Sequence, residues 1–475
     1  MTAQTILPAN TLATGGYEID NSCRFNGDAY VHKAVVAGNQ RTFTYSFWTK
    51  RSTLNGYQTF IGYAQSAGGG GSTNRGELIF VGDGDDTLRV GFNPGASSWS
   101  NYTMNTGVFR DTSAWYNIVL KLNTTNGTAS ERLKIFVNGV SQGLDGYPGQ
   151  NFDTGFNVDG YVYHVGRSAS GTGNFLKGYL AEAVFIDGTA LDADSFGEFD
   201  EDSGIWKPID VSGLTFGNNG FHLDFEASGN LGNDANGGTD FTEVTLAATD
   251  QTTDTCTNNF CTWNPLDTFY NTMTFQEGNT QGTKPNSSVE SYGTSTFGMT
   301  SGKWYAEFKV ISFSGSNSTI GFGIIDRVAV QNDKEIGKHT YGISYKSNGD
   351  VFSADGNLLT NQGTLAANDI IGLYIDIDNL KFYFAKNGTI ANSGTGLAIP
   401  ALTSTLNGVY FFGFDNFQAG GSVHQANWGN PAYTGTDKAD ANGFGSFEYD
   451  PSSGTFDSAS KDFLALCTKN LAENS

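Results

Sequence analysis

Four aromatic residues lie in turn-rich stretches where a ring face can meet a ligand. They are Tyr57, Trp99, Tyr102 and Tyr147, set among Gly, Ser and Asn residues between expected strands. Aromatic rings stack on the apolar face of a pyranose, while neighbouring amides and carboxylates bind its hydroxyls. These four residues are therefore the candidate glycan contacts. The equally weighted alternative is that they cap the core or pack against a neighbouring subunit.

Clustered carboxylates suggest a second kind of chemistry. Asp83, Asp85 and Asp86 occur together, and a second acidic run extends from Asp192 to Asp202. Such hard oxygen ligands suit calcium, although neither run matches the twelve-residue EF-hand loop. Calcium at Asp83, Asp85 or Asp86 is the one cofactor that the sequence suggests, and a solvated acidic turn is the alternative.

Carboxylates spaced for glycoside cleavage are missing from the first strand-rich region. Glycosidases use two carboxyl groups that flank the scissile bond, and no Glu-x-Asp-x-x-Glu pattern occurs there. Asp376 and Asp378 alternate correctly, but they belong to an expected structural hairpin. The histidines show no i, i+2 or i, i+4 pairing, and no Gly-x-Ser-x-Gly elbow or phosphate-binding glycine motif occurs. We therefore expect a protein that is not an enzyme.

The elements that must position these residues are expected to be antiparallel strands. The segments Leu133–Gly139 and Leu380–Gly388 each lead an apolar-rich strand into Asn-Gly. Asn-Gly is the pair that best tolerates positive φ at both centres of a type I′ hairpin turn. Each copy follows another strand-like run, Trp115–Leu120 in the first case and Ile370–Ile375 in the second. The sequence thus predicts the same antiparallel corner twice.

Strand spacing and turn composition predict an all-β fold with two antiparallel β-sandwich domains. The expected segments are a lead over 1–15, a first sandwich over 16–190, a Gly/Asn/Thr-rich connector with partial β structure over 191–289, a second sandwich over 290–430 and a tail over 431–475.

The net charge of the chain limits the kinds of molecule that it is expected to bind. The 475 residues carry a formal charge of −22, from 48 acidic against 26 basic side chains. Phosphate binding needs basic surface, so nucleic acid and anionic membranes are disfavoured as partners. No apolar run reaches the length of a membrane helix, and no signal peptide is visible at the N-terminus. The four cysteines are too sparse for a disulfide framework, so buried or free thiols are expected.

Two groups of sequence blocks carry a family resemblance. Residues 16–190 resemble a laminin-G-type, concanavalin A-like jelly roll, which implies a two-sheet sandwich that binds ligands at its rim. Residues 290–430 resemble a SPRY domain, which implies another two-sheet sandwich. The blocks behind the first resemblance are Phe43–Lys50, Trp115–Leu120, Leu133–Gly139, Phe175–Glu182 and Asp187–Leu191; those behind the second are Gly302–Phe308, Ile320–Ile324, Asp369–Asp376, Asn387-Gly388 and Ala426–Gly429.

The pair of modules, with an acidic composition and no export signal, resembles virion proteins of tailed bacteriophages, particularly tail fibres. That resemblance implies a protein made in the host cytoplasm and carried on the virion, with a host-surface glycan or protein receptor and other virion proteins as partners. A fibre would also imply a homotrimer, although no heptad seam supports one. The alternatives are a capsid decoration or assembly protein and, less favoured, a polysaccharide depolymerase.

Overall fold

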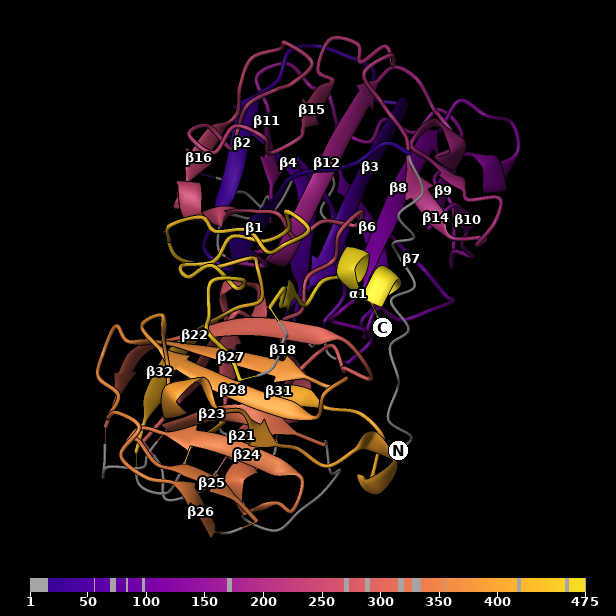
Figure 1. The fold of residues 1–475 in the computed structure, drawn as a ribbon. Helices are drawn as coiled ribbons and strands as arrows, with labels where there is room; N and C mark the ends of the chain where they lie inside the picture. Colours follow the sequence, from indigo (N-terminus) through magenta and orange to yellow (C-terminus); the bar gives the residue numbers. More distant parts are fainter. Residues whose placement is uncertain are drawn as a thin grey trace. The chain divides into compact units, whose positions relative to one another are not determined.

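The computed structural model divides the chain into two compact units. We call Thr14–Thr257 the N-terminal unit and Asn258–Ser475 the C-terminal unit; Figure 1 shows the fold of the chain. The residues that the structure describes are 16–54, 56–68, 74–82, 84–95, 99–168, 173–268, 273–286, 291–314, 320–326, 335–354, 356–416, 420–457 and 461–474. Both units are built from antiparallel sheets, which confirms the predicted all-β, two-sandwich class.

The N-terminal unit contains two large sheets, which we name after a central strand of each. The β3 sheet has the order β10 (Val140–Ser141), β9 (Leu133–Val137), β8 (Trp115–Asn123), β3 (Thr42–Arg51), β12 (Lys177–Asp187), β1 (Ser22–Asn26) and β17 (Gln251–Thr252), with β15 (Phe221–Leu223) paired to β12. The β5 sheet has the order β16 (Thr242–Val244), β2 (Tyr30–Ala34), β11 (Val162–Val165), β4 (Gln58–Ala64), β5 (Arg75–Phe80), β6 (Leu88–Asn93) and β7 (Ser100–Thr103). Strands β13 (Gly197–Phe199) and β14 (Trp206–Pro208) form a separate two-stranded sheet.

The core of the N-terminal unit is formed by alternate side chains of these two sheets. Phe47 from β3 packs on Phe60 from β4, with ring centroids 4.4 Å apart, and Phe43 stacks on Phe185 at 5.3 Å. Because successive side chains of a strand point to opposite faces, the residues between these core positions form an outer face on each sheet. On the β3 sheet that outer face is apolar, and Trp115, Tyr179 and Trp206 belong to the cluster that covers it.

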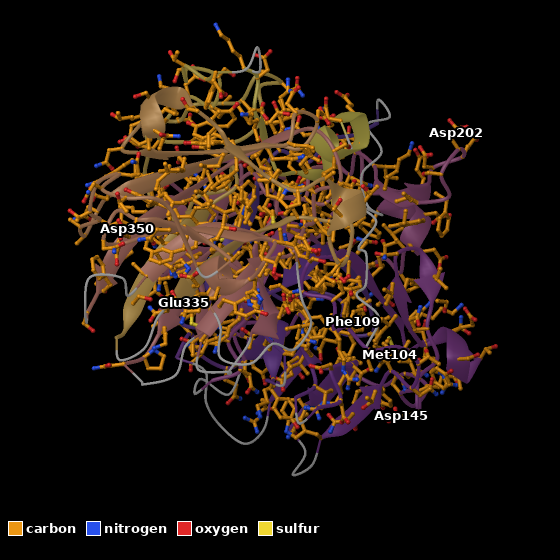
Figure 2. The ribbon with its side chains drawn as sticks, turned by 60° about the horizontal axis from the view of Figure 1, so that its bottom comes forward. Met104, Phe109, Asp145, Asp202, Glu335 and Asp350 are labelled. Atoms are coloured by element: carbon orange, nitrogen blue, oxygen red, sulfur yellow. The ribbon has the colours of Figure 1, made fainter. Side chains whose placement is uncertain are left out.

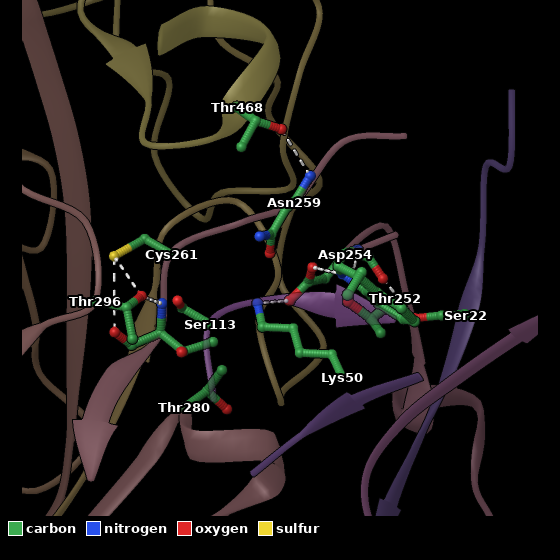
Figure 3. A network of polar contacts seen from close by, with 12 residues as sticks. Ser22, Lys50, Ser113, Thr252, Asp254, Asn259, Cys261, Thr280, Thr296 and Thr468 are labelled. Carbon is green, nitrogen blue, oxygen red and sulfur yellow. Dashed lines mark hydrogen bonds and ion pairs between the residues drawn. The ribbon is translucent and has the colours of Figure 1, made fainter. Parts of the chain in front are cut away.

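The region from 191 to 257, which we expected to be a connector, belongs to the first sandwich. Strand β15 pairs with β12, β16 with β2 and β17 with β1. A buried ion pair of 2.8 Å between Lys50 Nζ and Asp254 Oδ2 also ties this region to β3, as Figure 3 shows. These three strands have only two or three residues each, too few to give a readable alternation in the sequence. The first unit therefore ends at Thr257 instead of residue 190.

The C-terminal unit is a second sandwich. Its β23 sheet has the order β18 (Trp263–Thr268), β21 (Ser291–Ser295), β31 (Phe411–Asn416), β23 (Ile320–Ile325), β24 (Gly342–Lys346), β25 (Val351–Ser353) and β26 (Gly356–Leu359). Its β22 sheet has the order β19 (Thr274–Gln276), β20 (Gln281–Lys284), β32 (Ser422–Asn427), β22 (Lys303–Phe313), β27 (Ile370–Asp376), β28 (Lys381–Lys386) and β29 (Thr389–Ile390), with β30 (Leu397–Ala398) paired to β28 and β33 (Leu464–Ala465) to β22. Trp263 lies at the centre of the core, 4.9 Å from Trp428 between ring centroids.

The expected C-terminal tail is an integral part of the second sandwich. Strand β33 runs parallel to β22, and the seven-residue helix α1 (Thr468–Asn474) follows it. The backbone N–H of Cys261 donates to the carbonyl of Leu466, so the start and the end of the unit are joined. The predicted domain of 290–430 left out residues 258–289 and 431–475, because the short strands β19, β20 and β33 and a helix of about two turns carry little periodic signal.

Both Asn-Gly hairpins form as predicted, and they share one hydrogen-bonding device. Asn138 and Asn387 have φ of 45° and 48°, and the glycines that follow have φ of 76° and 75°. Asn138 Oδ1 accepts from the backbone N–H of Asn117 at 2.8 Å, and Asn387 Oδ1 accepts from that of Ile370 at the same distance. In both hairpins the asparagine thus forms the turn and also binds the backbone of the preceding strand through its side chain.

The remaining regular elements are small. Short 3₁₀ turns lie at Ala129–Glu131, Ala193–Ser195, Ala248–Asp250, Glu277–Asn279, Ile336–Lys338, Asn392–Gly394 and Leu402–Ser404. None of the described helices has the length and apolar character needed to cross a membrane. All four cysteines are buried free thiols, as expected. Acidic side chains such as Asp145 and Asp202 are exposed at the surface of the N-terminal unit (Figure 2).

Candidate functional site

A polar pocket lies on the outer face of the β5 sheet. The pairing places Glu77 of β5 opposite Gly91 of β6, and Gly91 opposite Asn101 of β7. Leu78, Phe80 and Val90 point into the core, so the residues that alternate with them point outward. The pocket has a volume of about 190 Å³ and is lined by Arg75, Glu77, Arg89, Trp99, Asn101, Ser168 and Asn174.

Trp99 is the aromatic element of this pocket. A Cβ on Gly91 would lie 2.9 Å from Cε3 of the indole, so the absence of a side chain at position 91 is what lets the ring approach the sheet. The guanidinium of Arg75 lies over the indole at 5.0 Å from the ring centroid. The Trp99 side chain is half-buried, which leaves part of the ring accessible to a ligand. The pocket thus offers an accessible aromatic ring beside hydrogen-bonding groups.

Two arginines supply the charge of the pocket. Arg89 lies over the ring of Tyr57, with the guanidinium carbon 5.6 Å from the ring centroid. Among the described residues, neither Arg75 nor Arg89 has a hydrogen-bond or ion-pair partner, and the Nε atom of each is buried without an acceptor. A guanidinium carries five N–H donors in a planar fork. Ring contacts hold both groups, and their terminal Nη donors, which have no acceptor among the described residues, are the ones available to a ligand.

Glu77 is the one carboxylate that lines the pocket. It is only 6% exposed, and its Oε2 accepts hydrogen bonds from Ser168 at 2.8 Å and Thr59 at 3.4 Å. Burial raises the pKa of Glu77 above its usual value, although the Ser168 hydrogen bond and the charges of Arg89 and Arg75 oppose that shift. A second carboxylate, which glycoside cleavage would need, is absent from the described lining.

The four predicted aromatic contacts occupy different environments. Trp99 lines the pocket, and Tyr57 supports it through Arg89. Tyr102 follows Asn101 in the strand and therefore points to the other side, where it packs against the core near Phe92. Tyr147 is 38% exposed and does not line the pocket. The structure thus brings two of the four together.

Of the three predicted calcium ligands the structure describes two, Asp85 and Asp86, and the surroundings of Asp86 do not suit calcium. Asp86 is 1% exposed and binds two guanidinium groups, those of Arg51 and Arg110, each at 3.2 Å. Positive charge against both of its oxygens does not fit a divalent cation. Asp85 is exposed, and Asp83 lies outside the described residues. Elsewhere in the described ranges no group of three His, Cys, Asp or Glu side chains could hold a metal ion.

A second hollow of about 570 Å³ lies in the N-terminal unit, and Asp187 and Asp153 are among the residues that line it. Asp187 accepts from the backbone N–H of Asn39 at 2.9 Å and from the side chain of Asn157 at 3.1 Å. Asp153 is paired with Arg41 at 2.6 Å. Both carboxylates are therefore already engaged by neighbouring groups and hold loops together.

Sequence reasoning missed Arg75, Glu77 and Arg89. Part of their signal was present, because Arg75 and Glu77 are two residues apart and Arg89 lies between the apolar Leu88 and Val90. What the sequence did not contain was the register that places Glu77 beside Gly91 and Gly91 beside Asn101.

Solved structures with a similar chain trace include β-sandwiches from several organisms. The SPRY domain of human HERC1 covers 34% of this chain and 96% of its own, with 16% identity and a TM-score of 0.29. A pentraxin from Limulus polyphemus covers 37% of this chain and 80% of its own, with 16% identity and a TM-score of 0.28. A carbohydrate-binding protein described as putative, from Bacteroides ovatus, covers 48% of this chain and 58% of its own, with 18% identity and a TM-score of 0.31.

These TM-scores are too low for any of the three to carry an argument about function. No curated protein matches the chain. Residues 25–195, in the N-terminal unit, match the Laminin_G_3 family model, which is described as "Concanavalin A-like lectin/glucanases superfamily". The resemblance predicted for residues 16–190 is confirmed over that range: this part of the chain is similar to the concanavalin A-like lectins and glucanases.

Proposed function

We propose that the N-terminal unit binds carbohydrate in the pocket on the outer face of the β5 sheet. The observation that carries the proposal is the half-buried indole of Trp99 beside the amide of Asn101 and two guanidinium groups, those of Arg75 and Arg89, which have no partner among the described residues. An aromatic ring flanked by planar hydrogen-bonding groups suits a pyranose, which has an apolar face and hydroxyls around its edge. The family name, which covers lectins and glucanases, supports the same ligand class.

Binding without cleavage is the form of activity that the pocket favours. The matched family name includes glucanases, so hydrolysis is the competing function. Retaining and inverting glycosidases need two carboxyl groups that flank the scissile bond. Glu77 is the one carboxylate of the described lining, and it is held by Ser168 and Thr59. A depolymerase is therefore the less favoured proposal, and release of reducing ends from a polysaccharide would revive it.

At the level of the organism, we propose a bacteriophage virion protein that recognises a host-surface glycan, as part of a tail fibre or similar appendage. The support is the combination of a concanavalin A-like module with a second sandwich in an acidic chain. A capsid decoration protein, which would use its sandwich faces for subunit contacts, is the alternative. Locating the chain in a map of the virus particle distinguishes these two proposals, because a position on the capsid would contradict the tail-fibre proposal.

The pocket proposal is tested by glycan binding of the full chain. An array of bacterial surface polysaccharides should give hits that Trp99→Ala abolishes. The matched control is Tyr147→Ala, which removes an exposed aromatic ring of the same unit that does not line the pocket. Equal loss in both variants, or hits that survive Trp99→Ala, would contradict the proposed site. No hit with the folded full chain would contradict carbohydrate binding itself.

A further inference from the structure

We infer that the sugar bound in this pocket carries a negative charge, as a carboxylate or a sulfate ester. The inference rests on the proposed carbohydrate function of the same pocket and names its ligand class. It starts from a contrast of charge: the chain has 48 acidic and 26 basic residues, yet this pocket is lined by two arginines and one glutamate.

The two guanidinium groups are placed as anion receptors. Arg75 and Arg89 lie on adjacent strands, and stacking on Trp99 and Tyr57 holds each group without using its N–H donors. Other arginines of the same unit have protein acceptors: Arg51 and Arg110 bind Asp86 and Arg41 binds Asp153, whereas Arg167 donates to the carbonyl of Ala67. Arg75 and Arg89 have no such partner among the described residues. The planar fork of a guanidinium matches carboxylate and sulfate oxygens, with which it forms charge-assisted bonds.

Glu77 does not cancel this charge. Hydrogen bonds from Ser168 and Thr59 hold its Oε2, and its side chain is almost fully buried. At most it neutralises one of the two guanidinium charges, so at least one positive charge remains for the ligand. Asn101 and Asn174 complete the lining with uncharged amides. An anionic group therefore supplies the acceptors that the two arginines lack.

The test compares charged and neutral forms of the same glycan on the full chain. The carboxylate probe is oligogalacturonate, with its methyl ester as the neutral form; the sulfate probe is dextran sulfate, with dextran as the neutral form. We expect at least one charged probe to bind about tenfold or more tighter than its neutral form, because charge-assisted hydrogen bonds to a guanidinium are roughly twice as strong as neutral ones. The probe that shows the preference identifies which anion the pocket takes.

Variants separate a specific pocket from a general effect of charge. Arg75→Gln with Arg89→Gln should abolish the preference for the charged probe, whereas Arg41→Gln with Arg110→Gln, which also removes two positive charges from the same unit, should change it less than about twofold. Circular dichroism and thermal unfolding check that the variants fold. A preference that persists in the pocket variant, or is lost equally in the control, overturns the inference.

Two further outcomes distinguish the anion inference from the carbohydrate proposal. Binding of neutral glycans that depends on Trp99 but not on ligand charge overturns the inference and leaves the carbohydrate proposal standing. Polyglutamate that binds as tightly as the charged glycans, and depends on the same two arginines, supports anion recognition and overturns carbohydrate as the ligand.

Discussion

The outer faces of two sheets, one in each unit, differ in whether a segment of the same unit covers them. In the C-terminal unit the outer face of the β22 sheet is aromatic, and Phe447 and Phe463 from the final segment cover Tyr305, Tyr374 and Tyr383. In the N-terminal unit the outer face of the β5 sheet carries the polar pocket around Trp99. A face covered by its own chain is scaffold. The other face keeps a half-buried ring and two arginines without a partner among the described residues, and there we propose that a ligand binds.

The cover of the β22 sheet is held by one buried carboxylate. Glu307 accepts hydrogen bonds from the backbone N–H groups of Glu448 at 2.9 Å and Tyr449 at 2.8 Å. Three side chains also donate to it: Tyr305 at 2.9 Å, Asn427 at 3.1 Å and Tyr433 at 3.3 Å. Glu307 therefore has a structural role, in contrast to Arg75 and Arg89 of the β5 sheet, which have no acceptor among the residues that the structure describes.

The largest effect should come from removing this carboxylate. Glu307→Ala leaves five donors without their acceptor, and at roughly 1 kcal/mol each the C-terminal unit should lose about 5 kcal/mol of unfolding free energy. Chemical denaturation of the full chain measures the loss. Ser312→Ala, at an exposed position of the same strand, is the control and should have almost no effect. A loss below about 1 kcal/mol would contradict the view that Glu307 holds the cover.

The second largest loss of stability should come from a cavity between the final segment and the β22 sheet. Phe463 is fully buried between Tyr374, Tyr383 and Phe456, so Phe463→Ala should cost about 4 kcal/mol. The matched control is Leu406→Ala, because Leu406 is 65% exposed in the same unit. Thermal unfolding that shifts equally in both variants would show that the segment does not cover the β22 sheet.

Acid pH should lower the stability of the N-terminal unit through a histidine on the outer face of the β5 sheet. His164, on the outer face of β11, has its pKa lowered to about 4, first by burial and then by the charge of Arg167. The unfolded chain takes up a proton below pH 6.5, but the folded chain does so only near pH 4. Stability of the N-terminal unit should therefore fall as pH drops from 6.5 to 4, by on the order of 3 kcal/mol.

Histidine NMR resonances and unfolding curves at several pH values measure this effect. His164→Asn should reduce the loss of stability of the N-terminal unit between pH 6.5 and pH 4. The same substitution should not change the pH dependence of stability of the C-terminal unit, where burial lowers the pKa of His424 to about 3. An imidazole of His164 that titrates near pH 6.5 would show that this part of the face is open to water.

The smallest effect on stability should come from the pocket itself. Trp99 is half-buried outside the core, so Trp99→Ala should change the unfolding free energy by less than about 1 kcal/mol. Glycan binding by the same variant should be lost, which is the reverse of the pattern expected for Glu307→Ala. A destabilisation as large as that of Phe463→Ala would make Trp99 part of the scaffold, and the contrast between the two faces would fail.

Local signals in the sequence were sufficient for the parts of the fold that depend on adjacent residues. The hairpins at Asn138 and Asn387 were predicted because Asn-Gly specifies its own turn. The all-β class followed from alternation within the longer strands. The short strands β15, β16 and β17 were missed because their position depends on partners far away in the chain.

The same limit applies to the candidate site. Trp99 and Tyr57 were named from their turn-rich context, but Tyr102 follows Asn101 on a strand, and alternation turns it inward. Asp86 was read as a calcium ligand because its partners Arg51 and Arg110 are remote in sequence. Arg75 and Arg89 become notable only when the register shows that they share a face without a partner.

The most direct test of the central claim is the crystal structure of the full chain with a glycan that it binds. The account predicts a pyranose in contact with Trp99 and hydrogen-bonded to Arg75 or Arg89, on the outer face of the β5 sheet. A glycan seated at Tyr147 or on the C-terminal unit, with the pocket around Trp99 empty, would contradict it.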